Sequence, residues 1–121
     1  MAEPWMLDYS DGSSNHTRIW QEGEAVRYEY TPTTPQHSSS GTYSGGRPTR
    51  GLVPEAFVVE LWGRIQAMAT DTSQHTRVRI MGSGAFTIAI DDDAQHFQVR
   101  RCASLRDFDA WLRATLNLGR G

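Results

Sequence analysis

Two stretches with apolar residues at helical spacing, each preceded by short alternating runs, constrain the fold of this 121-residue chain most. The first follows Pro54, a residue suited to the first position of a helix, and its apolar positions are Phe57, Val58, Leu61, Trp62, Ile65 and Met68. The second has Leu105, Phe108, Trp111, Leu112 and Leu116. Apolar residues at this spacing form a stripe along one side of a helix, which has to be buried against another element. We therefore expect two amphipathic helices.

Six short runs alternate apolar and polar residues, as half-buried strands do. They span residues 5–9, 16–20, 25–30, 77–81, 85–90 and 96–100. Short turns between most of them favour antiparallel neighbours in sequence order. Each half of the chain then contains three strands followed by a helix. We predict an α+β fold: two βββα halves that form a mostly antiparallel sheet with two helices packed on one face, in a single domain over residues 1–121.

The predicted core lies between the helices and the sheet. On the helices we expect burial of Phe57, Leu61, Trp62, Ile65, Phe108, Trp111 and Leu112, and on the strands of Tyr28, Val78, Ile80, Phe86 and Ile88. Cys102, the only cysteine, precedes the second helix, for which Ser104 and Asp107 resemble a capping box. We expect a buried, unreactive thiol, because cysteine is among the most buried residue types; the alternative is a thiol activated by the helix N-terminus.

Composition excludes several classes of function. The net charge of −2 gives no general attraction to nucleic acid or to an anionic membrane. No apolar run approaches the roughly 20 residues of a membrane span, and the first ten residues lack the basic and apolar regions of a signal peptide. A single cysteine excludes an internal disulfide and a CxxC motif. We therefore expect a cytoplasmic protein that binds neither nucleic acid nor membrane.

The segment 31–53 is a long connection rich in glycine, serine and proline. Connections of more than about 12–15 residues without regular structure are uncommon in compact domains, and are usually functional or disordered. One interpretation is an ordered structural loop over residues 37–47, pinned by Tyr43. The other is a small polar pocket for a ligand or partner, and its candidate residues are His37, Ser40, Tyr43, Ser44 and Arg47. The segment matches neither GxxxxGK[ST] nor GxGxxG, so it is a weak nucleotide signal.

No pattern in the chain predicts a catalytic residue, a metal site or a cofactor. The histidines, at positions 16, 37, 75 and 96, lack HxH or HExxH spacing, and no serine lies in a GxSxG elbow. The acidic residues Asp8 and Asp11 do not fit a calcium-loop register, and the run 91–93 reads as a solvated hairpin tip. His16 and His96 both fall on predicted strands, and the sequence leaves open whether they meet in space.

The leading functional hypothesis is a small non-enzymatic binding or protein-interaction module that uses the 31–53 loop, the open face of the sheet, or both. An antiparallel sheet covered on one side leaves its other face to water or to a partner. That face is predicted to carry Arg27, Glu29, Arg77, Arg79, Gln98 and Arg100. The partner would be another protein or a small polar ligand. The alternative is a small, hydrolase-like enzyme with a pocket between the 37–47 loop and the sheet, and the oligomeric state stays open.

Overall fold

The computed structural model describes residues 5–12, 15–33, 46, 48–78, 82–90 and 93–116. In chain order its elements are β1 (Trp5–Ser10), β2 (His16–Glu22), β3 (Ala25–Thr31), β4 (Thr49–Val53), α1 (Glu55–Thr70), the 3-10 helix η2 (Thr72–Gln74), β5 (Gly84–Ile90), β6 (Asp93–Val99) and α2 (Ala103–Leu116).

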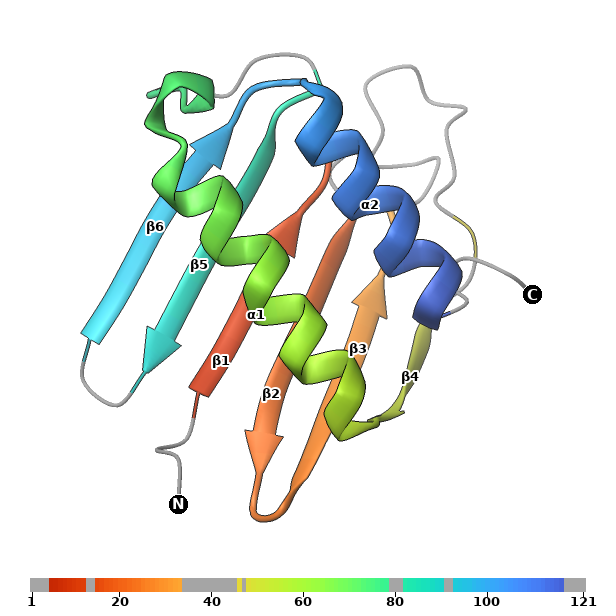
Figure 1. Cartoon of the computed structure of the whole chain (residues 1–121). Helices are drawn as coiled ribbons and strands as arrows, with labels where there is room; N and C mark the ends of the chain where they lie inside the picture. The colour runs from red at the N-terminus through yellow and green to blue at the C-terminus, as the bar shows by residue number, and fades with distance from the viewer. Residues whose placement is uncertain are drawn as a thin grey trace.

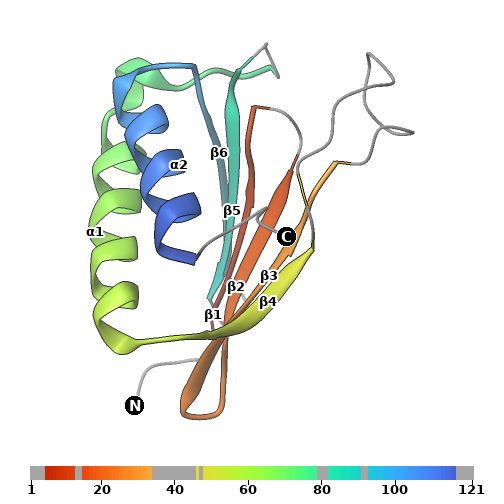
Figure 2. The ribbon, with the colours of Figure 1, turned by 90° about the vertical axis from the view of Figure 1, so that its right-hand side faces the viewer.

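Within the described residues, the strands form one six-stranded sheet in the order β4-β3-β2-β1-β5-β6. Every pair of neighbouring strands in it is antiparallel. The two helices lie side by side over one face of this sheet (Figure 1), and the view along the sheet shows the opposite face uncovered by either helix (Figure 2). The predicted α+β class, the antiparallel sheet and the placement of both helices on one face are confirmed.

Among the described residues, four strands precede α1 and two follow it, whereas the prediction had three in each half. The additional strand β4 lies at the end of the expected 31–53 loop and pairs with β3 in register, with Gly51 opposite Tyr28. A Cβ at Gly51 would lie 3.2 Å from the Tyr28 ring, so glycine leaves room for that ring beneath the helices. The glycine and the preceding Pro48, which made this segment look like a loop, are compatible with a short edge strand.

The predicted strand over residues 77–81 is wrong where the structure describes it. Arg77 and Val78 form a bend, and Val78 is 63% exposed instead of buried. The Thr76 hydroxyl donates to the Val78 carbonyl oxygen (3.1 Å) and accepts from the Val78 amide (3.4 Å). This local turn satisfies backbone groups that a strand would have paired with a neighbour. The rest of the predicted strand, including Ile80, lies outside the described residues.

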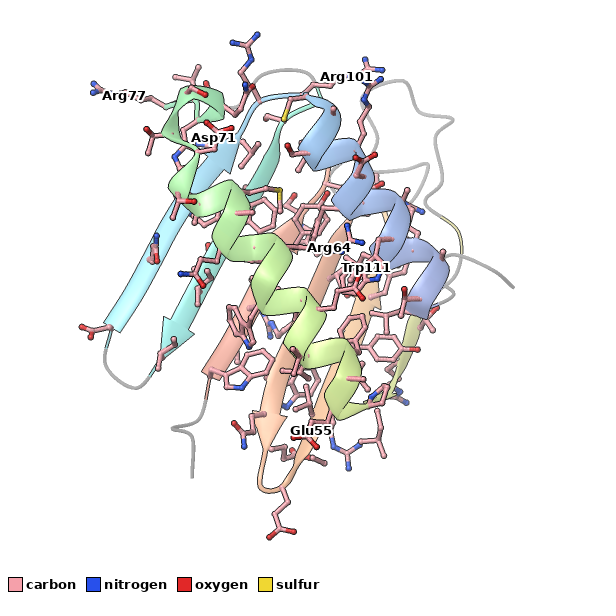
Figure 3. All side chains as sticks on the ribbon, viewed as in Figure 1. Glu55, Arg64, Asp71, Arg77, Arg101 and Trp111 are labelled. Atoms are coloured by element: carbon pink, nitrogen blue, oxygen red, sulfur yellow. The ribbon has the colours of Figure 1, made fainter. Side chains whose placement is uncertain are left out.

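The core lies between the helices and the covered face of the sheet, as predicted. The expected residues that are buried are Tyr28, Phe57, Leu61, Ile65, Phe86, Ile88, Phe108 and Leu112. Trp62 and Trp111 are half-buried at its margin. Trp111 stacks on Phe57 with ring centroids 4.9 Å apart, and the Arg64 guanidinium lies 4.8 Å from the Trp111 ring on the side of α1 (Figure 3). These contacts join the two helices above the sheet.

Candidate functional site

A buried polar cluster joins the turn between β1 and β2 to helix α2. The Asp11 carboxylate accepts hydrogen bonds from the backbone and side-chain nitrogens of Asn15, both at 2.9 Å, and from Arg113 at 3.0 Å. Asn15 in turn accepts a hydrogen bond from the Thr33 amide at 2.8 Å. Asp11 and Asn15 are both buried. The cluster therefore ties together three segments: the β1–β2 turn, the residues that follow β3 and helix α2.

The same arginine connects the cluster to a second carboxyl group, that of Asp109. Arg113 donates to Asp109 at 3.3 Å, and the Tyr9 hydroxyl donates to the other oxygen of Asp109 at 3.0 Å. Burial raises the pKa of Asp109, the nearby negative charge of Asp11 raises it further, and Arg113 opposes this change. Burial and the negative charges of Asp109 and Asp11 also raise the pKa of Tyr9, so its hydroxyl stays a donor. The acids, the arginine and the phenol bind one another, an arrangement that fastens α2 to the sheet.

A row of charged residues crosses the open face of the sheet. Cross-strand register places Arg50 opposite Glu29, Glu29 opposite Arg18, and Arg18 opposite Asp8, so the sign of the charge alternates from β4 to β1. Arg18 forms an ion pair with Asp8 at 3.3 Å, and His16 lies 3.6 Å from the same carboxylate. Opposite charges directly across neighbouring strands stabilise a sheet modestly, and the whole row presents a patterned polar surface to solvent.

A second, largely apolar row runs beside the charged one. Its members, in strand order from β4 to β6, are Leu52, Arg27, Trp20, Met6, Ala89 and Ala94. Leu52 is 61% exposed, and Met6 is also exposed. Arg27 interrupts the row and is neutralised by an ion pair with Glu22. The open face thus places apolar side chains next to ordered charges, a combination that protein interfaces use.

Two hollows of about 390 Å³ each lie where β3 and β4 meet. One is lined by Trp20, Glu22, Arg27, Tyr28, Glu29, Arg50 and Gly51, and the other by Glu29, Tyr30, Thr31, Pro48, Thr49 and Arg50. Both share Glu29 and Arg50 from the charged row. The charged row therefore borders both hollows.

The five candidate residues of the loop, His37, Ser40, Tyr43, Ser44 and Arg47, lie outside the described residues. The same holds for Arg79 of the predicted open face. Arg27 and Glu29 are exposed on that face, as predicted, and Gln98 is half-buried in it. Arg77 instead follows η2 in a bend, and Arg100 follows the end of β6. The sequence prediction missed Asp8, Arg18 and Arg50 of the charged row and Met6, Trp20 and Leu52 of the apolar row, because only strand pairing aligns them.

The remaining candidates are also located by the structure. His16 lies on β2 and His96 on β6, with β1 and β5 between them. Three strand spacings of about 4.8 Å separate them by roughly 14 Å, so these histidines do not meet. Cys102 is half-buried rather than fully buried. Helix α2 begins directly after it, with the Arg106 amide donating to the Cys102 carbonyl oxygen, so Ser104 is not the capping residue.

The described residues show neither a metal-binding cluster nor a membrane-spanning helix. No group of three or more of their histidine, cysteine or acidic side chains is arranged to hold a metal ion. None of their helices has the length and apolar character to cross a membrane. In comparisons with known proteins, no protein-family model matches the chain and no curated protein sequence is significantly similar to it.

Proposed function

We propose that this protein is a non-enzymatic binding module that recognises another protein through the open face of its sheet. The observation that supports the proposal is the pair of adjacent rows on that face, one of alternating charge and one largely apolar. The apolar row supplies surface that gains free energy when a partner removes it from water. The charged row supplies specificity, because a partner with the wrong order of charges is repelled.

The centre of the proposed surface is the β3–β4 edge region around Leu52 and Trp20. Leu52 is the most exposed large apolar side chain of this face, and Trp20 lines the adjoining hollow with Arg27 and Arg50. Tryptophan and arginine are the residue types that most often dominate binding energy at interfaces. Because Arg50 and Leu52 belong to β4, the end of the 31–53 segment is itself part of this surface. We place the module in the cytoplasm, where a lone thiol such as Cys102 stays reduced.

The test compares two substitutions of similar exposed apolar residues on opposite sides of the molecule. Leu52→Ser changes the open face, and Val59→Ser changes α1, where Val59 is 71% exposed. Both should alter the free energy of unfolding by less than about 0.5 kcal/mol, because neither side chain is packed. Quantitative affinity capture from the native host should recover a partner with the wild type and with Val59→Ser, and lose it with Leu52→Ser. Equal recovery by both variants would refute the open face as the binding surface.

A further inference from the structure

Along the first half of β6, the outer edge carries backbone groups that no described residue pairs with. At the other end, the segment after η2 covers the edge: the Thr76 amide donates to the Gln98 carbonyl oxygen at 3.0 Å, and the Arg100 amide donates to Gln74 at 2.8 Å. Backbone groups alternate in direction along a strand, so the amide and carbonyl groups of Ala94 and His96 also point outward. No described residue pairs with them.

The two ends of this edge carry opposite charge and an exposed apolar side chain each. At the hairpin end, Asp93 is exposed and Ile90 is 42% exposed. At the covered end, Arg77 is exposed and Val78 is 63% exposed. Figure 3 shows Arg77 pointing outward on the β6 side of the sheet. The edge is therefore polarised, with an acidic end and a basic end separated by open backbone.

We propose that this edge binds a second copy of the chain, so that two β6 strands pair antiparallel about a twofold axis near Gln95. In this register Ala94 of each copy lies opposite His96 of the other, and their outward amide and carbonyl groups supply the central backbone hydrogen bonds. Asp93 then lies towards the Arg77 end of the other copy, and Ile90 towards its Val78, each contact occurring twice. A twofold interface has to be self-complementary in this way.

The acidic and basic ends of the β6 edge favour binding of a second copy of the chain over binding of an arbitrary peptide strand. Acidic residues on an edge strand normally discourage pairing with other chains. Here the sequence has three consecutive aspartates, residues 91–93, and a parallel, in-register pairing of two copies would bring these acids together. The antiparallel arrangement sets the acidic end beside Arg77 instead. The dimer would join two six-stranded sheets edge to edge and place both open faces on the same side, independently of whether those faces bind a partner.

The first test removes one outward hydrogen-bond donor. Ala94→Pro deletes the outward amide but leaves the ladder to β5 intact, which is where proline is tolerated in a sheet; Ala94→Ser is its matched control. Sedimentation velocity over a range of concentrations should show a monomer–dimer equilibrium for the wild type and for Ala94→Ser, and a monomer for Ala94→Pro with an unchanged circular dichroism spectrum. A wild-type protein that stays monomeric at every concentration overturns the proposal.

The second test uses charge reversal and does not depend on how well the proline variant folds. Asp93→Arg and Arg77→Asp should each raise the dimer dissociation constant by about tenfold or more, because each change creates two repulsive contacts per dimer. Mixing the two single variants should restore dimers. In the mixed dimer the two substituted side chains attract each other at one end, and the native pair of charges remains at the other.

The outcomes of this mixing experiment separate the proposed pairing from a nonspecific effect of charge. Mixing that leaves both variants monomeric, or single reversals that leave the dissociation constant unchanged, overturns the proposed pairing. The double variant, with both charges reversed in one chain, should dimerise like the wild type.

Discussion

Replacing Asp11 by asparagine tests whether the buried cluster holds α2 to the sheet. Asp11→Asn keeps the shape of the side chain but replaces one carboxylate oxygen with an NH₂ group. In the wild type, one carboxylate oxygen accepts hydrogen bonds from the side chains of Asn15, at 2.9 Å, and Arg113, at 3.0 Å. The amide can turn its one carbonyl oxygen towards these two side-chain donors, and its NH₂ group then faces the Asn15 backbone amide, a donor that loses its acceptor.

The magnitude follows from the burial of the partners. A hydrogen bond that involves a charged group contributes about 1.5–3 kcal/mol to stability. The lost bond from the Asn15 backbone amide falls at the lower end of this range. The bonds from the side chains of Asn15 and Arg113 keep an oxygen acceptor but lose its charge, which lowers each by about half. Arg113, whose side chain is 32% exposed, also retains Asp109 as a partner. We expect the free energy of unfolding to fall by about 3 kcal/mol. For a chain of this size, that corresponds to a melting temperature lower by about 10 °C.

The assay is equilibrium unfolding in urea at neutral pH, followed by tryptophan fluorescence. Asp107→Asn, at an exposed position on α2, is the matched control and should change the free energy of unfolding by less than about 0.5 kcal/mol. A second readout is the titration of Asp109 by NMR: its pKa should fall in Asp11→Asn, because the charge of Asp11 raises it in the wild type. If Asp11→Asn is as stable as the control and the Asp109 pKa does not change, the cluster has no such role.

Three further predictions concern single positions. In thermal or urea unfolding, Gly12→Ala should lower the free energy of unfolding by about 1–3 kcal/mol, because its Cβ would lie 2.7 Å from the Gly82 backbone. Gly63→Ala on α1 is the control: its Cβ meets no atom within 4 Å, so this substitution should raise the free energy of unfolding by up to about 1 kcal/mol. Because the folded-state pKa of Asp109 is raised, its contribution to stability is greatest below the ordinary carboxyl pKa and declines as the pH rises from there through the folded-state pKa. The free energy of unfolding, measured across acidic pH, should show this decline in the wild type and not in Asp109→Asn. Trp111→Ala should cost about 2–3 kcal/mol, less than a fully buried tryptophan, because it removes a half-buried ring stacked on Phe57; a loss below about 1 kcal/mol would contradict the packing of α1 on α2.

The sequence predicts those features that depend on local periodicity. The alternating strands before the long connection and the two amphipathic helices follow from side-chain spacing alone, and the structure has them in the expected places. The strand predicted from the alternating pattern of residues 77–81 is wrong at Val78, which lies at an apolar position of that pattern but is exposed. There the Thr76 hydroxyl satisfies the backbone locally, and a two-residue period cannot report such a competing interaction.

The buried cluster was not predictable because its members are far apart in the chain. In the sequence, Asp11 belongs to a turn, and Asp109 and Arg113 belong to the second helix, about a hundred residues later. In the folded protein the β1–β2 turn lies close to α2, which brings Arg113 within 3.0 Å of Asp11 and joins these residues in one cluster. The spacing of Asp109 and Arg113, four residues apart, was the one available signal, and it gives no indication of a partner from another element.

The sequence prediction treated the 31–53 loop and the open face of the sheet as two separate candidate surfaces, because it did not identify strand β4. With residues 31–53 read as loop, a loop site and a sheet-face site were different places. Pairing of β4 with β3 puts Arg50 beside Glu29 and Leu52 beside Arg27, so the end of that segment becomes the margin of the face. A partner that contacts Leu52 therefore contacts both the segment and the sheet. This is why Leu52→Ser is more informative than any substitution at the centre of the sheet: loss of binding identifies the one surface that the two hypotheses share.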